Sequence, residues 1–147
     1  MNPALTQKLS VLLAPASQTN SATRTANLDC LGADYATIVI NMASAINTNA
    51  VGPTLQLSES DDTTVTNFAT FNSNFNTSST SIVAARQIVY HVDTRSRKRY
   101  LRLSLTTATA TNDNVTAGVT ASLNRLATTP PAASNLLGST NDTVVVG

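Results

Sequence analysis

The feature that most constrains this chain is the alternation of apolar side chains with small polar ones along several short segments. Between residues 100 and 107, Leu101, Leu103 and Leu105 alternate with polar residues. A period of two places every second side chain on the same face of an extended backbone. The segment therefore predicts a β-strand with one face in a core and the other in water.

Similar segments recur along the chain, and helical periodicity is nearly absent. The expected strands are 35–42, 54–59, 82–92, 100–107 and 115–123, with a weaker candidate at 65–71 and a polar loop at 72–81. Turn-forming residues separate them, and the links at 94–98 and 111–114 predict hairpins. Short strands joined by short connections favour an antiparallel β-sandwich or barrel, so we predict an all-β fold.

The composition agrees with strands and excludes other classes. Thr, Ser and Asn account for 54 of 147 residues, 41% of residues are hydrophobic, 12% are charged, and the net charge is +1. A disordered chain would be more highly charged and less apolar. The single cysteine excludes a disulfide scaffold within the chain, and with one histidine it leaves too few ligands for a Cys/His zinc site.

Both ends of the chain differ from the middle. We expect an N-terminal arm and first strand at 1–27, a β-sandwich domain at 28–126 and an extended C-terminal arm at 127–147. Apolar side chains in the arms are expected to bury themselves on a neighbouring subunit, with a disordered C-terminal tail as the open alternative. The expected arm contacts are Leu9, Leu12, Leu13, Pro130, Pro131, Leu136, Leu137, Val144, Val145 and Val146.

Targeting signals are weak. The apolar run after Lys8, residues 9–14, is shorter and more polar than the core of a secretory signal. No stretch approaches the roughly 20 apolar residues of a membrane helix. We expect a soluble protein made in the cytoplasm, with no membrane partner.

Residues that could support catalysis are few. His91 is the only histidine and alternates within an expected strand, and Cys30 has no basic neighbour to lower its pKa. Glu59 with Asp61 or Asp62 could form a carboxylate pair, but a solvated turn is commoner at a strand end. No glycine-rich phosphate loop occurs. We expect no enzyme activity, no cofactor and no metal site.

One charged segment stands out. Five of the nine basic residues lie within eight positions: Arg95, Arg97, Lys98, Arg99 and Arg102. These side chains could pair internally with Asp61, Asp62 or Asp93, dock on another protein, or bind nucleic acid. Nucleic acid is the least expected partner, because the net charge is only +1 and aromatic residues make up only 4%.

Three segments, in this order, resemble a known family: 27–40 (NLDCLGADYATIVI), 55–62 (LQLSESDD) and 90–103 (YHVDTRSRKRYLRL). Across residues 9–126 the chain resembles the capsid decoration, or cement, proteins of tailed bacteriophages. The resemblance implies a β-sandwich or jelly roll that oligomerises, as a homodimer or homotrimer. It also implies a place on the outer capsid surface of the virion, where the protein binds the major capsid protein and bridges neighbouring capsomers.

The resemblance brings no catalytic residues. The segment with Arg95, Arg97, Lys98, Arg99 and Arg102 is the expected docking feature for the capsid or a neighbouring subunit. Alternative functions stay open: another head or tail structural protein of a virion, a host-facing carbohydrate-binding β-sandwich and, last, a hydrolase using Glu59 or Asp61. The lack of Trp weighs against a sugar site, because such sites usually stack on aromatic rings.

Overall fold

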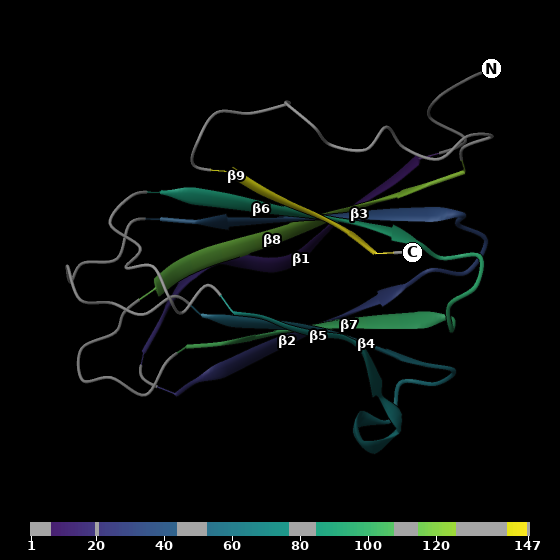
Figure 1. Cartoon of the computed structure of the whole chain (residues 1–147), viewed down its shortest axis with the longest axis horizontal. Helices are drawn as coiled ribbons and strands as arrows, with labels where there is room; N and C mark the ends of the chain where they lie inside the picture. Colours follow the sequence, from purple (N-terminus) through teal and green to yellow (C-terminus); the bar gives the residue numbers. More distant parts are fainter. Residues whose placement is uncertain are drawn as a thin grey trace.

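The computed structural model describes residues 7–19, 21–43, 53–76, 85–107, 115–125 and 141–146, and for 72–76 and 141–146 it describes the backbone alone. Within these residues the chain forms nine strands and one short 3-10 turn (Figure 1). They are β1 (Gln7–Gln18), β2 (Thr23–Asp29), β3 (Tyr35–Met42), β4 (Thr54–Ser60), η2 (Val65–Asn67), β5 (Ala69–Asn76), β6 (Arg86–Asp93), β7 (Tyr100–Thr106), β8 (Val115–Asn124) and β9 (Asn141–Val146).

The strands form two sheets that pack face to face (Figure 1). The five-stranded sheet has the order β1-β8-β3-β6-β9, and the four-stranded sheet has the order β2-β7-β4-β5. The first eight strands pair only antiparallel, and the chain changes sheet at each of their connections except β4 to β5. The orders 1-8-3-6 and 2-7-4-5 are those of an eight-stranded jelly roll. The predicted all-β sandwich is confirmed.

The inner faces of the two sheets form one hydrophobic core. The alternation predicted these faces correctly, because the residues assigned to them are at most 6% exposed. From the five-stranded sheet they are Ala36, Ile38, Ile40, Met42, Ile88, Tyr90, Val92, Val115, Ala117, Val119, Ala121 and Leu123; from the other sheet they are Leu55, Leu57, Leu101, Leu103 and Leu105. Each large aliphatic side chain buried here contributes about 1.5–3 kcal/mol.

Two hairpin predictions and part of one loop prediction were wrong. The link at 94–98 is not a hairpin, because β6 and β7 lie in different sheets, and the link at 111–114 joins β7 and β8, which also lie in different sheets. Alternation reports which face of a strand is buried but not which strand it pairs with. The segment at 65–71 divides into η2 and the start of β5, and β5 continues through 72–76 in the expected loop.

The C-terminal strand departs from the antiparallel pattern. β9 lies at the edge of the five-stranded sheet, parallel to β6, with Val144 beside Tyr90 and Val146 beside Val92. Val145 lies beside His91 in the same register. Pro130, Pro131, Leu136 and Leu137 lie outside the described residues. The division at 27 and 127 into arms and domain stays a prediction.

A tight contact joins the edge of the sandwich to its centre. The β1–β8 register shifts between Val11 and Leu13 and again between Leu13 and Ala16, which marks bulges. At this point Pro15 lies against Gly118, where an added Cβ would stand 2.9 Å from the proline Cγ. Arg24, from the other sheet, donates hydrogen bonds to the carbonyl oxygens of Ala14 (2.7 Å) and Ala117 (3.0 Å). The missing side chain at Gly118 therefore lets the bulged edge strand sit against β8.

Replacing this glycine tests that contact. We expect Gly118→Ala to destabilise the fold by about 1–3 kcal/mol in urea unfolding, the usual cost of forcing extra atoms into packed space. Pro15→Ala in the same chain removes the ring atoms and should recover most of the loss. Equal stability of Gly118→Ala and the wild type would contradict the tight approach.

Candidate functional site

Charged side chains gather at one end of the sandwich. At this end β2, β4, β6 and β8 finish and β1, β3, β5 and β7 begin, and we refer to it as the charged end. It holds six basic side chains (Lys8, Arg95, Arg97, Lys98, Arg99 and Arg125) and six acidic ones (Asp29, Asp34, Glu59, Asp61, Asp62 and Asp93). A chain with only 12% charged residues thus concentrates most of its charge in one place.

Backbone hydrogen bonds hold the connections of the charged end together. Thr94 is buried and donates its hydroxyl to the carbonyl of Ala33 (2.8 Å) and its amide to that of Asp34 (2.9 Å). The amide of Cys30 donates to the carbonyl of Arg99 at 2.9 Å. Gly32 completes the tight turn between β2 and β3 with φ of +77°, a backbone conformation that glycine adopts without strain. The β2–β3 and β6–β7 connections are therefore joined to each other, and together they hold the basic side chains in place.

Arg95 and Arg99 each form a forked ion pair with an aspartate. Arg95 donates from Nε to Asp93 Oδ1 at 2.9 Å and from Nη2 to Oδ2 at 2.5 Å. Arg99 donates in the same way to the two oxygens of Asp29, at 2.9 and 2.7 Å. These hydrogen bonds lower the pKa of both carboxyl groups below the usual range. The second pair joins residues that lie 70 positions apart in the sequence.

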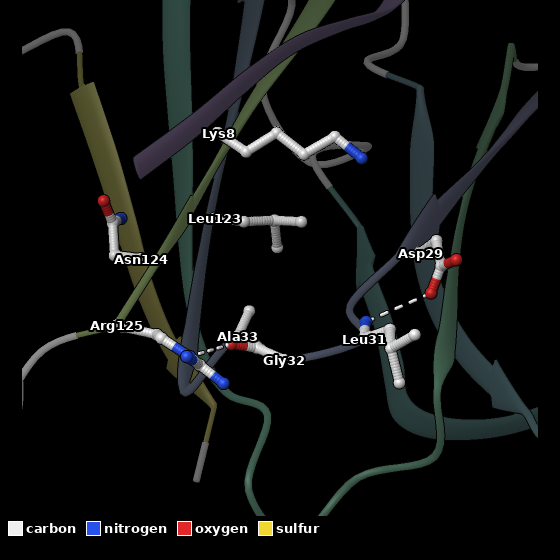
Figure 2. A pocket seen from close by; sticks show the side chains of 8 residues that line it. All are labelled: Lys8, Asp29, Leu31, Gly32, Ala33, Leu123, Asn124 and Arg125. Carbon is white, nitrogen blue, oxygen red and sulfur yellow. Dashed lines mark hydrogen bonds between the residues drawn. The ribbon is translucent and has the colours of Figure 1, made fainter. Parts of the chain in front are cut away.

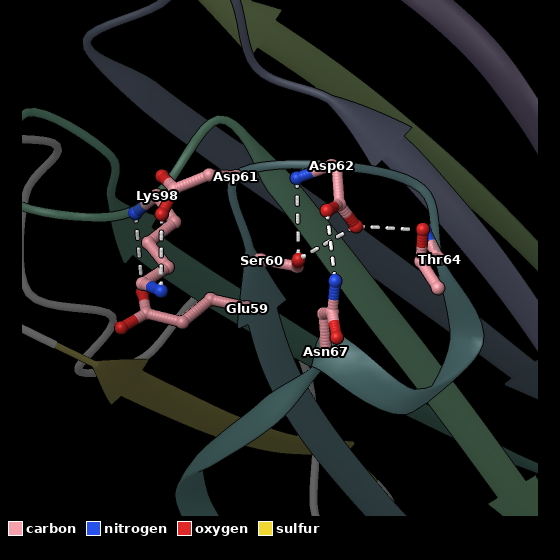
Figure 3. Close-up of polar contacts among 7 residues, drawn as sticks. All are labelled: Glu59, Ser60, Asp61, Asp62, Thr64, Asn67 and Lys98. Carbon is pink, nitrogen blue, oxygen red and sulfur yellow. Dashed lines mark hydrogen bonds and ion pairs between the residues drawn. The ribbon is translucent and has the colours of Figure 1, made fainter.

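Figure 3 shows the acidic residues at the end of β4 and just after it, with several of their partners. Lys98 lies 3.1 Å from Asp61 through its ammonium group, and its backbone amide donates to Glu59 at 3.3 Å. Arg97 Nη1 lies 4.0 Å from the same Glu59 carboxylate. The carboxylates proposed for a hydrolase, Glu59 and Asp61, are both engaged by basic groups of this chain.

Asp62 stabilises the turn that follows β4. It accepts hydrogen bonds from the Thr64 amide and the Asn67 side chain, both at 2.8 Å, and its own amide donates to the Ser60 hydroxyl (Figure 3). The bond from Asn67 contributes most to lowering the pKa of this carboxyl group. Asp62 therefore shapes the turn. Of the three aspartates expected to pair with the basic residues, Asp61 and Asp93 do so.

Arg102 belongs to a different environment. It lies on the outer face of β7, where the segment 61–68 covers it to 8% exposure. Its guanidinium stacks 3.6 Å from the centre of the Phe68 ring and donates to Asn27 (2.9 Å) and to the carbonyl of Val65 (3.0 Å). Arg102 therefore fastens this segment to the outer face of the four-stranded sheet.

The guanidinium groups also cover aromatic rings. Arg95 lies over Tyr35, Arg97 over Phe71 and Arg99 over Tyr100, with distances of 4.4–4.9 Å to the ring centres. All five predicted docking cations thus have partners inside the chain, in agreement with the internal-pairing alternative. The charged end presents alternating charges rather than a cationic field, and its role in docking stays a prediction.

The structure adds two basic residues that the sequence did not single out. Lys8 and Arg125 line a cavity of about 450 Å³ at the charged end, together with Asp29 and Leu123 (Figure 2). Arg125 donates through Nε to the carbonyl of Gly32 at 2.5 Å. Both residues lie at the end of a strand in a chain with few charges. Their position at strand ends was the one sequence feature that could have identified them.

The other residues considered for catalysis lie apart. His91 is half-buried on the outer face of β6, with Nδ1 3.1 Å from the Thr37 hydroxyl, and burial lowers its pKa. Cys30 is buried, and loss of hydration raises the pKa of its thiol to about 12. No group of three or more potential metal ligands occurs among the described residues. In the same part of the chain, no helix is long and apolar enough to span a membrane.

Comparison with known proteins gives distant likenesses only. No protein-family model matches the chain, and no curated protein matches it. Chains from the structures of the infectious bursal disease virus Gx and Gt strains are 11% and 10% identical, with TM-scores of 0.41 and 0.39. They are matched over 79% and 80% of this chain, which spans about a third of their length (31% and 33%).

The coat protein of Tobacco streak virus is 11% identical, with a TM-score of 0.31, over 90% of this chain and 96% of that one. At these levels of similarity the comparisons assign no family. The resemblance to tailed-phage decoration proteins therefore rests on the sequence motifs alone.

Acid titration tests the aspartate–arginine pairs. A carboxyl group whose pKa is lowered by folding stabilises the fold above its unfolded pKa, and this contribution disappears as the pH falls through the lowered value. We expect Asp29→Asn to be less stable than the wild type near neutral pH, and the difference to shrink towards zero below about pH 4.

The control for this titration is Asp34→Asn at the same end, because that side chain makes no hydrogen bond among the described residues. It should change stability less at every pH. Stability is measured by thermal unfolding at each pH. If Asp29→Asn lowered stability by the same amount at every pH, the Arg99 pair would not act through the charge of Asp29.

Proposed function

We propose that this protein is a structural component of a virus particle. More specifically, we propose that it decorates the outer capsid of a tailed bacteriophage and bridges neighbouring capsomers. The observation that carries the proposal is a sheet face on which the outward side chains of three neighbouring strands are uncharged. On β1, β8 and β3 the outward side chains include Leu9 and Val11, which are 74% and 68% exposed. Large exposed apolar side chains that lie together mark a surface for another protein.

The uncharged face is continuous across three strands. Besides Leu9, Val11 and Gly118, its outward residues are Gln7, Thr116, Thr120, Ser122, Asn124, Tyr35, Thr37, Val39 and Asn41, and Tyr35 borders the charged end, where Arg95 lies over its ring. An open hollow of about 430 Å³ runs over Leu9, Val11, Val39 and Thr120. Without charged groups to dehydrate, such a face can be covered by a flat protein surface at little electrostatic cost.

The opposite face of the sandwich is partly occupied by its own chain. The segment 61–68 folds over the four-stranded sheet and leaves Ser58 and Ser60 6% and 1% exposed. The two outer faces are therefore unequal in the described part of the chain, which supports the face of the five-stranded sheet as the docking face.

The jelly-roll strand order is common to viral capsid proteins and lectins, and a fold by itself does not define a function. The lectin alternative predicts exposed aromatic rings for stacking on sugars. Of the described aromatic side chains, Tyr90 is buried and Tyr35, Phe68, Phe71 and Tyr100 each stack against an arginine of this chain. This arrangement supports a structural role over carbohydrate binding.

Decoration also fits the energetics of a repeated shell. Many copies that dock weakly give a large total affinity when each copy contacts more than one site. The charged end can contribute at the rim, where arginines already paired with aspartates would meet polar groups of the major capsid protein. The second candidate is another head or tail structural protein of a virion. The order of assembly distinguishes it from a decoration protein, because a decoration protein binds a completed capsid.

Binding to capsids that lack the protein tests this function. We expect wild-type protein to co-sediment with such capsids and to raise the temperature at which they release DNA. Val39→Lys should weaken binding by about tenfold or more, because it places a charge in the centre of the proposed docking face. The matched control is Ser104→Lys on the outer face of β7, which should bind as the wild type does.

Absence of binding by the wild-type protein would overturn the decoration function. Loss of binding in Ser104→Lys but not in Val39→Lys would move the docking face to the other sheet.

Exchanging the members of one ion pair tests the rim. The double variant Asp93→Arg with Arg95→Asp keeps the pair of opposite charges but reverses their positions. We expect the double variant to bind capsids more weakly, because the charges that meet the shell are exchanged. We also expect some loss of stability, because Asp93 accepts a hydrogen bond from the Arg95 backbone amide and Arg95 lies over Tyr35. Capsid binding as in the wild type would show that the pair serves only the fold.

A further inference from the structure

We infer that β1 pairs with β1 of a second copy of this chain, antiparallel and centred on Leu9. The two five-stranded sheets then continue into one another across a two-fold axis. This interface is a property of the isolated protein and does not depend on the proposed function.

The first reason is an open strand edge. β1 is the outermost strand of its sheet, and β8 is the one described strand that pairs with it. The backbone groups on its other side therefore lack a strand partner in the described part of the chain. An exposed edge of this kind is a template for another strand, and proteins that stay monomeric usually blunt it.

The second reason is that only half of the edge is blunted. From Val11 onward the register shifts twice and Pro15 interrupts the strand, and bulges and prolines are devices that prevent edge pairing. The five residues from Gln7 to Val11 pair with β8 in unbroken register. This regular segment is about 17 Å long and has Leu9 at its centre.

The third reason concerns the choice of partner. A two-fold axis through Leu9 places Leu9 opposite its own copy and Gln7 opposite Val11 on the outer face. On the inner face it places Lys8 opposite Ser10, so no like charges lie directly opposite each other. Leu9 is 74% exposed in the single chain and would pack side by side with its own copy on the outer face. The segment is thus complementary to itself in charge and in apolar surface.

The pairing would also double the docking face. A two-fold axis that joins two edge strands within one sheet stands perpendicular to that sheet. The outer faces of both copies therefore lie on the same side, and a dimer presents two docking faces to one surface. Each face alone can then bind weakly, because the second contact is made at high effective concentration.

Sedimentation of the isolated protein tests the pairing. The interface is short, so we expect a weak dimer that is clearly populated at roughly 100 µM chain. Leu9→Lys should raise the dimer dissociation constant at least about tenfold, because two ammonium groups would then face each other at the axis. The side chains at 9 and 11 are exposed, so the variants are expected to fold, which thermal unfolding at low concentration checks.

A pair of double variants tests the register. In the inferred register Gln7 lies opposite Val11 of the second copy. Gln7→Glu with Val11→Lys therefore creates two attractive pairs and should keep the dimer. Gln7→Lys with Val11→Lys creates two repulsive pairs and should abolish it.

A wild-type protein that stays monomeric at this concentration, or equal behaviour of the two double variants, would overturn the inference. A wild-type monomer whose binding to capsids is lost in Leu9→Lys would assign the edge to a strand of the capsid, which also overturns pairing with a second copy. Sedimentation of the isolated protein uses no capsids. A monomeric result would therefore overturn the pairing without bearing on the proposed decoration function.

Discussion

The contact between the two inner sheet faces is the constraint on which the rest of the structure depends. Leucines from β7 and β4 meet isoleucines and valines from β3, β6 and β8, and these side chains are almost completely buried. With so few charged residues in the chain, burial of these apolar faces is the main source of stability. Because each strand contributes one face to the core, its other face is free to carry function.

Charge is distributed to suit this arrangement. The sheet faces are neutral or nearly so, and ion pairs collect at the end where the short connections meet. There they join distant parts of the chain, as Arg99 does with Asp29 and Lys98 with Asp61. The same segregation leaves the outer face of β1, β8 and β3 without charge, which makes that face suitable for another protein. Ion pairs at the end and an uncharged face are thus two results of one pattern.

The sequence alone was sufficient for some of these features and insufficient for others. The alternation around Leu101, Leu103 and Leu105 predicts a strand and its buried face, because both are local properties. The partner of each strand is not local: β3 pairs with β6 and with β8, which lie some 50 and 80 residues further along the chain. The two hairpin predictions were wrong for this reason.

The basic segment shows the same limit. Its pairing with Asp93 and Asp61 could be suggested, because both were identified as candidates from the sequence. The pairing of Arg99 with Asp29 could not, because the loops that bring them together are joined only in the fold. The stacking of Arg102 under Phe68 depends on a turn that Asp62 shapes, and alternation does not report turns of this kind.

The central claim is that this protein acts through the outer face of its five-stranded sheet. The most direct measurement is an image reconstruction of a capsid with the protein bound, at a resolution that separates the two sheets. We expect β1, β8 and β3 to face the shell and the segment 61–68 to face away from it. A reconstruction in which the four-stranded sheet or the charged end alone contacts the shell, or in which no density for the protein appears, would contradict the central claim.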